Sequence, residues 1–117
     1  MANPNLLQPT TIYGKTAVEL VMPPPTSAIV SNPTASNKIY KINSLYVSCV
    51  NSSDGELDII LSRGGTDYRL GLNIIVPVGS SIDVIAKHIY LEEGDSLKLE
   101  ASVTSSLEAV CSYEEIS

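Results

Sequence analysis

The sequence predicts a single all-β domain, an antiparallel β-sandwich or jelly roll of about eight short strands with an extended N-terminal arm. Apolar residues recur at every second position in most segments, and turn residues separate these segments at intervals of about 8–12 residues. No stretch has the apolar spacing of an amphipathic helix. The length of 117 residues suits one domain.

The N-terminal arm is expected over residues 1–14 and the sandwich domain over residues 15–117. Pro4 and Pro9 interrupt the arm, and its polar residues show no periodicity. A first strand is expected over residues 15–21, where neither face is cleanly polar. Three consecutive prolines then prevent further sheet pairing and favour a stiff, extended connection.

The longest strand is expected over residues 38–50. Its apolar phase changes around Asn43 and Ser44, which predicts a β-bulge there. Gly64 and Gly65 permit positive φ and predict a tight hairpin. The strand that returns over residues 66–75 is expected to place its alternating apolar residues on one face, namely Tyr68, Leu70, Leu72 and Ile74.

The remaining strands are short. Ile82, Val84 and Ala86 alternate in one, and residues 89–91 form another before a turn in which Gly94 is expected to be left-handed. Two final strands are expected where apolar residues alternate with polar ones, at Leu97, Leu99 and Ala101 and at Leu107, Ala109, Cys111 and Tyr113.

Composition argues against several classes of partner. A net charge of −6, with seven scattered Lys and Arg residues, disfavours nucleic acid, whose phosphates need clustered basic groups. No run reaches the roughly 18 apolar residues of a membrane span, and the first residues lack a secretory signal, so assembly in the cytoplasm is expected.

Charged residues make up only 17% of the sequence. Either part of the surface is buried against a partner, or Ser, Thr and Asn supply the polarity.

Cys49 and Cys111 each lie inside an alternating run. They could form a disulfide, but without a secretory signal two buried thiols in a reducing compartment are the favoured interpretation.

A search for reactive residues identifies no catalytic, cofactor or metal site, so the chain is predicted not to be an enzyme. The one histidine, His88, has no Gly-x-Ser-x-Gly motif to support a hydrolase interpretation. Glu92, Glu93 and Asp95 could suggest calcium, although a solvated turn explains them as well. A carbohydrate-binding module or small hydrolase is disfavoured because the chain lacks Trp and Phe platforms.

Most of the chain resembles small structural proteins of tailed phages that infect marine bacteria, notably cyanobacteria. The three-proline segment matches them least. The matching stretches are the following: Met-Ala-Asn-Pro-Asn-Leu-Leu at 1–7, Gly-Lys-Thr-Ala at 14–17, Gly-Gly-Thr-Asp-Tyr at 64–68, Ile-Val-Pro-Val-Gly-Ser-Ser-Ile at 75–82, Ile-Tyr-Leu-Glu-Glu-Gly-Asp-Ser-Leu-Lys-Leu at 89–99, and Leu-Glu-Ala-Val-Cys-Ser-Tyr-Glu-Glu-Ile-Ser at 107–117.

The resemblance implies a virion structural protein, expected to be a capsid decoration or cement protein on the phage head. The alternative is a tail, neck, baseplate or fibre adaptor, or a receptor-binding module. The expected partners are the major capsid protein or other virion proteins, together with copies of the chain itself as a dimer or trimer. The contacts would use a sandwich face or edge and these arm and proline-segment residues: Asn5, Leu6, Leu7, Ile12, Pro23, Pro24 and Pro25.

Overall fold

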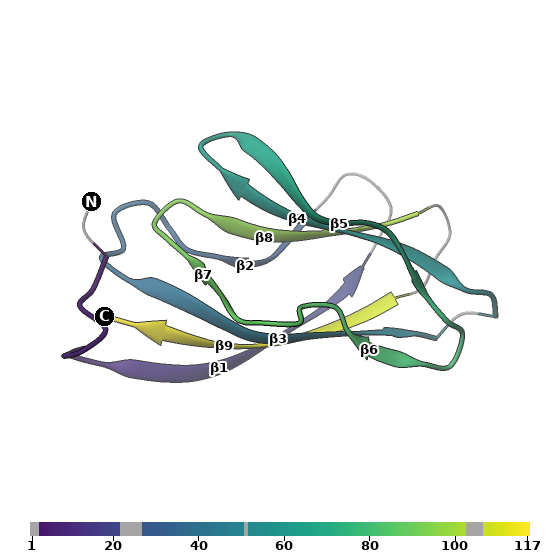
Figure 1. Cartoon of the computed structure of the whole chain (residues 1–117), viewed down its shortest axis with the longest axis horizontal. Helices are drawn as coiled ribbons and strands as arrows, with labels where there is room; N and C mark the ends of the chain where they lie inside the picture. The colour runs from purple at the N-terminus through teal and green to yellow at the C-terminus, as the bar shows by residue number, and fades with distance from the viewer. Residues whose placement is uncertain (1–2, 22–26, 51, 103–106) are drawn as a thin grey trace.

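The computed structural model describes residues 3–21, 27–50, 52–102 and 107–117. Two antiparallel sheets pack face to face in a sandwich of about 47 × 26 × 19 Å (Figure 1). The strands are β1 (Ile12–Val21), β2 (Ser27–Ser31), β3 (Ile39–Cys49), β4 (Gly55–Arg63), β5 (Thr66–Val76), β6 (Ser81–Asp83), β7 (Ile89–Leu91), β8 (Ser96–Ala101) and β9 (Leu107–Ile116). Within the described residues no helix is long and apolar enough to cross a membrane.

The strand order is that of a jelly roll. One sheet runs β1-β9-β3-β6, with β7 also paired to β3, and the other runs β2-β8-β4-β5. Strands β6 and β7 pair with opposite ends of β3, so together they act as one interrupted edge strand. Counted in this way, each sheet has four strands, and every connection except the β4–β5 hairpin crosses from one sheet to the other, as in a jelly roll. The predicted all-β sandwich is confirmed.

The core lies between the sheets and follows directly from the period-two pattern. On β3 the buried residues Leu45, Val47 and Cys49 alternate with exposed or half-buried ones. The same alternation on β8 and β9 buries one face of each strand, because successive side chains of a strand point to opposite sides. The two buried faces meet across the sandwich in one apolar cluster.

The predicted bulge in β3 is present. Ile42 pairs with Tyr113 and Ser44 with Ser112, so Asn43 is an extra residue on β3. The hairpin between β4 and β5 also follows the prediction. Its two loop residues, Gly64 and Gly65, have φ values of 61° and 79°, which glycine adopts without steric cost.

Three expectations need correction. Strand β1 begins at Ile12 rather than at residue 15, because Ile12 pairs with Ile116. The two residues lie at opposite ends of the sequence, so no local pattern reveals this pair. The short strand expected to include Ile82, Val84 and Ala86 is β6, which ends at Asp83. The single apolar face expected for residues 66–75 is wrong, since register shifts add two residues to β5. Ile74 packs against the core, whereas Leu72 is exposed.

A buried carboxylate joins the end of β9 to its neighbours. Glu115 accepts hydrogen bonds from Lys15 at 2.7 Å and from Lys38 at 3.3 Å. Burial acts to raise the pKa of Glu115, but the hydrogen bonds from both lysines outweigh it and hold the pKa below its ordinary value of 4.5.

The stacked rings of Tyr40 and Tyr113 lie on neighbouring strands, with centroids 5.7 Å apart.

The two cysteines are free and buried, as favoured from the sequence. Cys111 lies opposite Leu45 on β3, and Cys49 lies opposite Leu107, four residues further along the ladder. At about 3.4 Å per residue this separation is about 14 Å, and a disulfide needs Cα atoms within about 7 Å. The fold therefore does not allow these thiols to join.

Replacing Glu115 with Gln should destabilise the protein at neutral pH by about 1 kcal/mol, because partly solvated lysines limit each charge-assisted hydrogen bond. A carboxylate with a lowered pKa stabilises the fold above the unfolded pKa, and this contribution is lost as pH falls through the folded pKa. Thermal unfolding over a series of pH values should show a difference in Tm between the unaltered protein and Glu115→Gln at pH 7. This difference should narrow as the pH falls through the folded pKa. Glu108→Gln, an exposed charge change on the same strand, is the control and should change Tm little. A difference in Tm that stays constant as the pH is lowered would contradict the assignment.

Both thiols should resist a thiol reagent in the folded protein. Burial raises the pKa of Cys111 to about 11, so little thiolate forms at neutral pH. Cys49 is also buried, and its Sγ lies 3.2 Å from the Ser53 carbonyl oxygen. Titration with Ellman's reagent should detect almost no thiol in native protein and both thiols in denaturant. Rapid labelling of folded protein would show that one cysteine is more accessible than the fold indicates.

Candidate assembly surface

The residues considered for chemistry serve structural roles. Arg63 donates hydrogen bonds to both carboxylate oxygens of Asp95, at 2.8 and 2.6 Å, and to Glu92 at 2.9 Å. The hydrogen bonds to Asp95 raise the pKa of Arg63, which stays charged. Asp95 also accepts from the backbone N–H of Glu92 at 2.8 Å and closes the turn before β8. Among the described residues no group of His, Cys, Asp and Glu could hold a metal ion.

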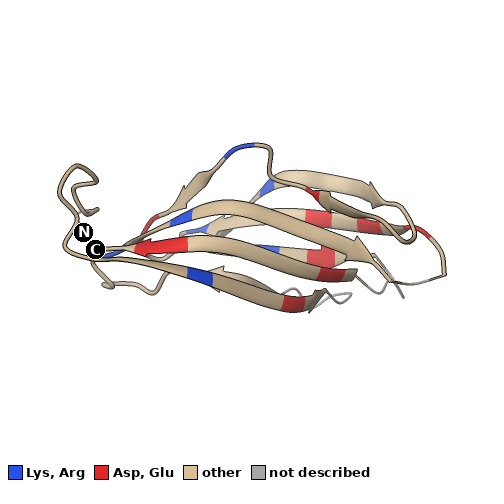
Figure 2. Ribbon diagram, turned by 90° about the horizontal axis from the view of Figure 1, so that it is seen from below, with Lys and Arg blue, Asp and Glu red and all other residues tan. Residues whose placement is uncertain are grey.

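The histidine considered for catalysis is exposed between β6 and β7. The His88 and Tyr90 rings lie edge to face, with centroids 5.5 Å apart. Figure 2 shows Lys and Arg placed singly along the ribbon in the view from below. These observations leave the apolar surface as the feature with potential for binding.

The first exposed apolar feature is the tip of the arm. The backbone N–H of Gln8 donates to the carbonyl of Asn5 at 3.2 Å, and the N–H of Leu7 donates to the Asn5 side chain at 2.9 Å. These bonds close a tight turn over residues 5–8. The turn presents Leu7, whose side chain is 91% exposed, while Leu6 is 44% exposed.

The arm is attached to the end of the sandwich rather than free. The backbone N–H groups of Thr10 and Thr11 donate to the carbonyl of Ser117, and the N–H of Ser117 donates back to Thr11. The hydroxyl groups of Thr11 and Ser117 are also hydrogen-bonded to each other. Asn3 donates to the Glu92 carboxylate at 2.9 Å. The arm therefore holds Leu7 in a defined position.

The second apolar feature is the outer face of β1 and β9. Val18 on β1 pairs with Val110 on β9, and Val110 pairs with Tyr46 on β3. Because paired residues lie side by side on one face, the three form a row across three strands. Leu20 lies two residues further along β1. We call the row and Leu20 together the β1–β9 patch.

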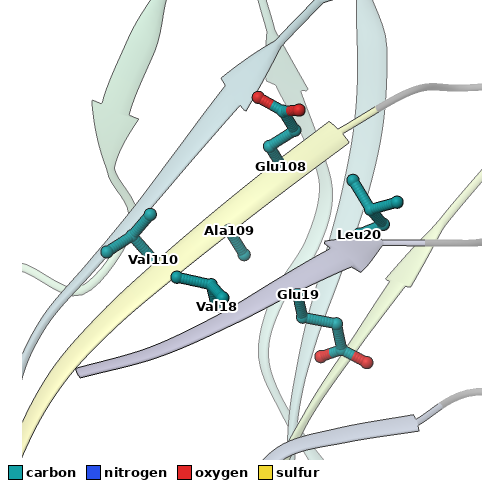
Figure 3. A pocket seen from close by; sticks show the side chains of 6 residues that line it. All are labelled: Val18, Glu19, Leu20, Glu108, Ala109 and Val110. Atoms are coloured by element: carbon teal, nitrogen blue, oxygen red, sulfur yellow. The ribbon is translucent and has the colours of Figure 1, made fainter. Parts of the chain in front are cut away.

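A hollow of about 440 Å³ lies within this patch. Figure 3 shows Val18 and Leu20 projecting from β1, and Glu108 and Val110 projecting from β9, around a floor formed by the two strands. Glu19 points away on the other side of the sheet. Val18 is 73% exposed and Leu20 is 66% exposed, unusual for large apolar side chains at the middle and end of a strand.

The structure separates the residues predicted as an interface. Asn5, Leu6 and Leu7 share the turn of the arm, whereas Ile12 is the exposed first residue of β1. Pro23, Pro24 and Pro25 lie outside the described residues. The β1–β9 patch was missed as a site, although a signal existed. Neither face of residues 15–21 is cleanly polar, as expected for a strand with one face toward the core and the other available to a partner.

Comparisons with known proteins give the fold and no family. No family model matches the chain, and no curated protein matches it. A solved structure of Bacillus endospore appendages, described as a novel family of disulfide-linked pili, is similar over 100% of this chain and 94% of its own. The two are 18% identical in sequence, with a TM-score of 0.58. At that identity the likeness extends to the fold alone.

Proposed function

We propose that the chain is a non-catalytic structural subunit of a larger particle. Many copies of it would be present in each particle, and each would act by binding other protein chains. The observation that carries this proposal is the exposure of large apolar side chains, Leu7 on the arm and Val18 and Leu20 on β1. Isolated exposed leucines are common on soluble proteins. A row of apolar residues across three strands that borders a hollow is typical of a surface that another protein covers.

The particle favoured by the sequence resemblance is a phage virion, with the chain as a decoration or cement protein on the head. The jelly roll supports this proposal as a rigid scaffold whose loops and edges can present contacts. The arm would seat Leu7 in a depression on a neighbouring subunit, such as the major capsid protein. Complete burial of one leucine side chain contributes roughly 1.5–3 kcal/mol, and repetition over many copies would stabilise the shell.

Two other assemblies remain as alternatives. The same subunit could serve as an adaptor or receptor-binding module in the phage tail, neck, baseplate or fibre. The shared fold also allows a subunit of a surface appendage, since the similar structure belongs to a pilus. Any such fibre would differ from disulfide-linked pili, because both cysteines of this chain are buried and free. Non-covalent contacts would then have to join the subunits.

Copy number separates head from tail. Mass spectrometry of purified particles should detect the chain in a fixed ratio to the major capsid protein, with hundreds of copies for a head protein and few for a tail component. Absence of the chain from purified virions would contradict both phage alternatives. Recovery from extracellular fibres would instead favour the appendage.

Replacing Leu7 with Asn should weaken attachment to the particle. Loss of roughly 1.5–3 kcal/mol of apolar burial corresponds to about a 10- to 100-fold lower affinity. Binding to undecorated particles can be measured by co-sedimentation over a concentration series. Leu72→Asn, at a residue that is also exposed but lies on β5, is the matched control. Equal binding by Leu7→Asn and the unaltered protein would show that the arm does not make the contact.

A further inference from the structure

The edge formed by β1 is unusually regular. All residues from Ile12 to Val21 pair with β9 without a register shift. Strand β9 lies on one side of β1, and among the described strands none pairs with its other side. In an antiparallel edge strand, the N–H and C=O groups of alternate residues point away from the sheet. The free side of β1 therefore offers a long row of backbone hydrogen-bonding groups.

The other edges of the sandwich are interrupted. Strand β5 contains two register shifts, and beside one of them Asn73 has φ 53° and donates its N–H to Asp58 at 2.8 Å. Strand β2 has five residues and an irregularity of its own, while β6 and β7 have three residues each. Bulges and short edge strands prevent pairing between molecules. Among the described strands, β1 is the long edge that lacks such protection.

We propose that β1 pairs with β1 of a second copy of this chain, antiparallel and around a two-fold axis at Val18, so that the two outer sheets join into one. A two-fold axis brings the same residues of both copies into register and matches their free backbone groups by symmetry. This inference rests on the proposed assembly function and specifies one of its contacts.

The apolar row selects the register. When Val18 lies opposite Val18 of the second copy, the row Tyr46–Val110–Val18 continues into its symmetric equivalent across six strands. Leu20 then lies opposite Thr16 of the second copy, on the same face. This arrangement joins the two apolar patches and reduces the exposure of the strongly exposed side chains at the edge.

The charges on β1 are compatible with this register. The strand carries one basic and one acidic side chain, Lys15 and Glu19. Lys15 would lie opposite Val21 of the second copy and diagonally beside its Glu19. No like charges would face each other directly across the new ladder, and the diagonal pairs would be attractive. The overall charge of −6 therefore does not act against the contact at the junction itself.

A charge-exchange experiment tests the axis position. In Val18→Lys, each introduced lysine would face the same lysine of the second copy, and in Val18→Glu each introduced glutamate would face a glutamate. Each variant should lose the dimer, with at least a roughly tenfold weaker self-association, because like charges are juxtaposed. Mixing the two variants should restore dimers, since each introduced lysine then faces an introduced glutamate. Analytical ultracentrifugation can follow the shift between the 12.5 kDa monomer and twice that mass.

The matched control is Leu72→Lys, which introduces the same charge at an exposed residue of the interrupted β5 edge and should leave the dimer intact. Circular dichroism of each variant verifies that the strands remain folded, as expected for substitutions at exposed positions. A monomeric unaltered protein, a dimer disrupted by Leu72→Lys but not by Val18→Lys, or a mixture that stays monomeric would each overturn the proposal.

Particle incorporation is scored separately. If Val18→Lys is monomeric yet fully incorporated, the β1 contact exists but does not serve assembly in the particle. If the dimer forms as proposed and the unaltered chain never enters a particle, the proposed function fails while the edge pairing stands.

Discussion

The pairing of β3 with β9 is the contact on which the remaining structure depends. It runs from Ile39 opposite Ile116 to Cys49 opposite Leu107, and its inner face supplies a large part of the core. Because these two strands occupy the centre of their sheet, β1 must add outside β9, and β6 and β7 must add outside β3. The same arrangement that buries Leu45 and Cys111 therefore leaves β1 with a free side.

Much of the fold could be predicted because its determinants are local. Alternation identified the inner faces of β3, β8 and β9, and the phase change at Asn43 identified the bulge. The β4–β5 hairpin followed from Gly64 and Gly65. Strand β5 could not be predicted correctly, since its bulges depend on pairing with β4. The start of β1 depends likewise on Ile116, more than a hundred residues away.

The residues of the candidate surface could likewise be predicted only in part. The arm residues Leu6 and Leu7 were identified because apolar side chains in a segment without periodicity stand out from the sequence. Val18, Val110 and Tyr46 come from three strands that are distant in the chain, and only their register brings them together. The sequence of residues 15–21 showed that neither face of this strand is cleanly polar. The pattern could not specify which neighbour would complete the patch.

The extra residue in β3 also determines where the chain can change length. Tyr40 and Ile42 before the bulge, and Leu45 and Val47 after it, all face the interior because Asn43 restores the phase between them. Removal of that one residue would leave Ile42 and Ser44 opposite Tyr113 and Ser112, so the same side chains would stay buried in a strand without a bulge. A further inserted residue that no bulge absorbs would instead turn one half of the strand over and exchange its buried and solvent-facing side chains. The loops can absorb insertions and deletions during evolution, and within β3 the bulge is the position at which the loss of one residue preserves the alternation.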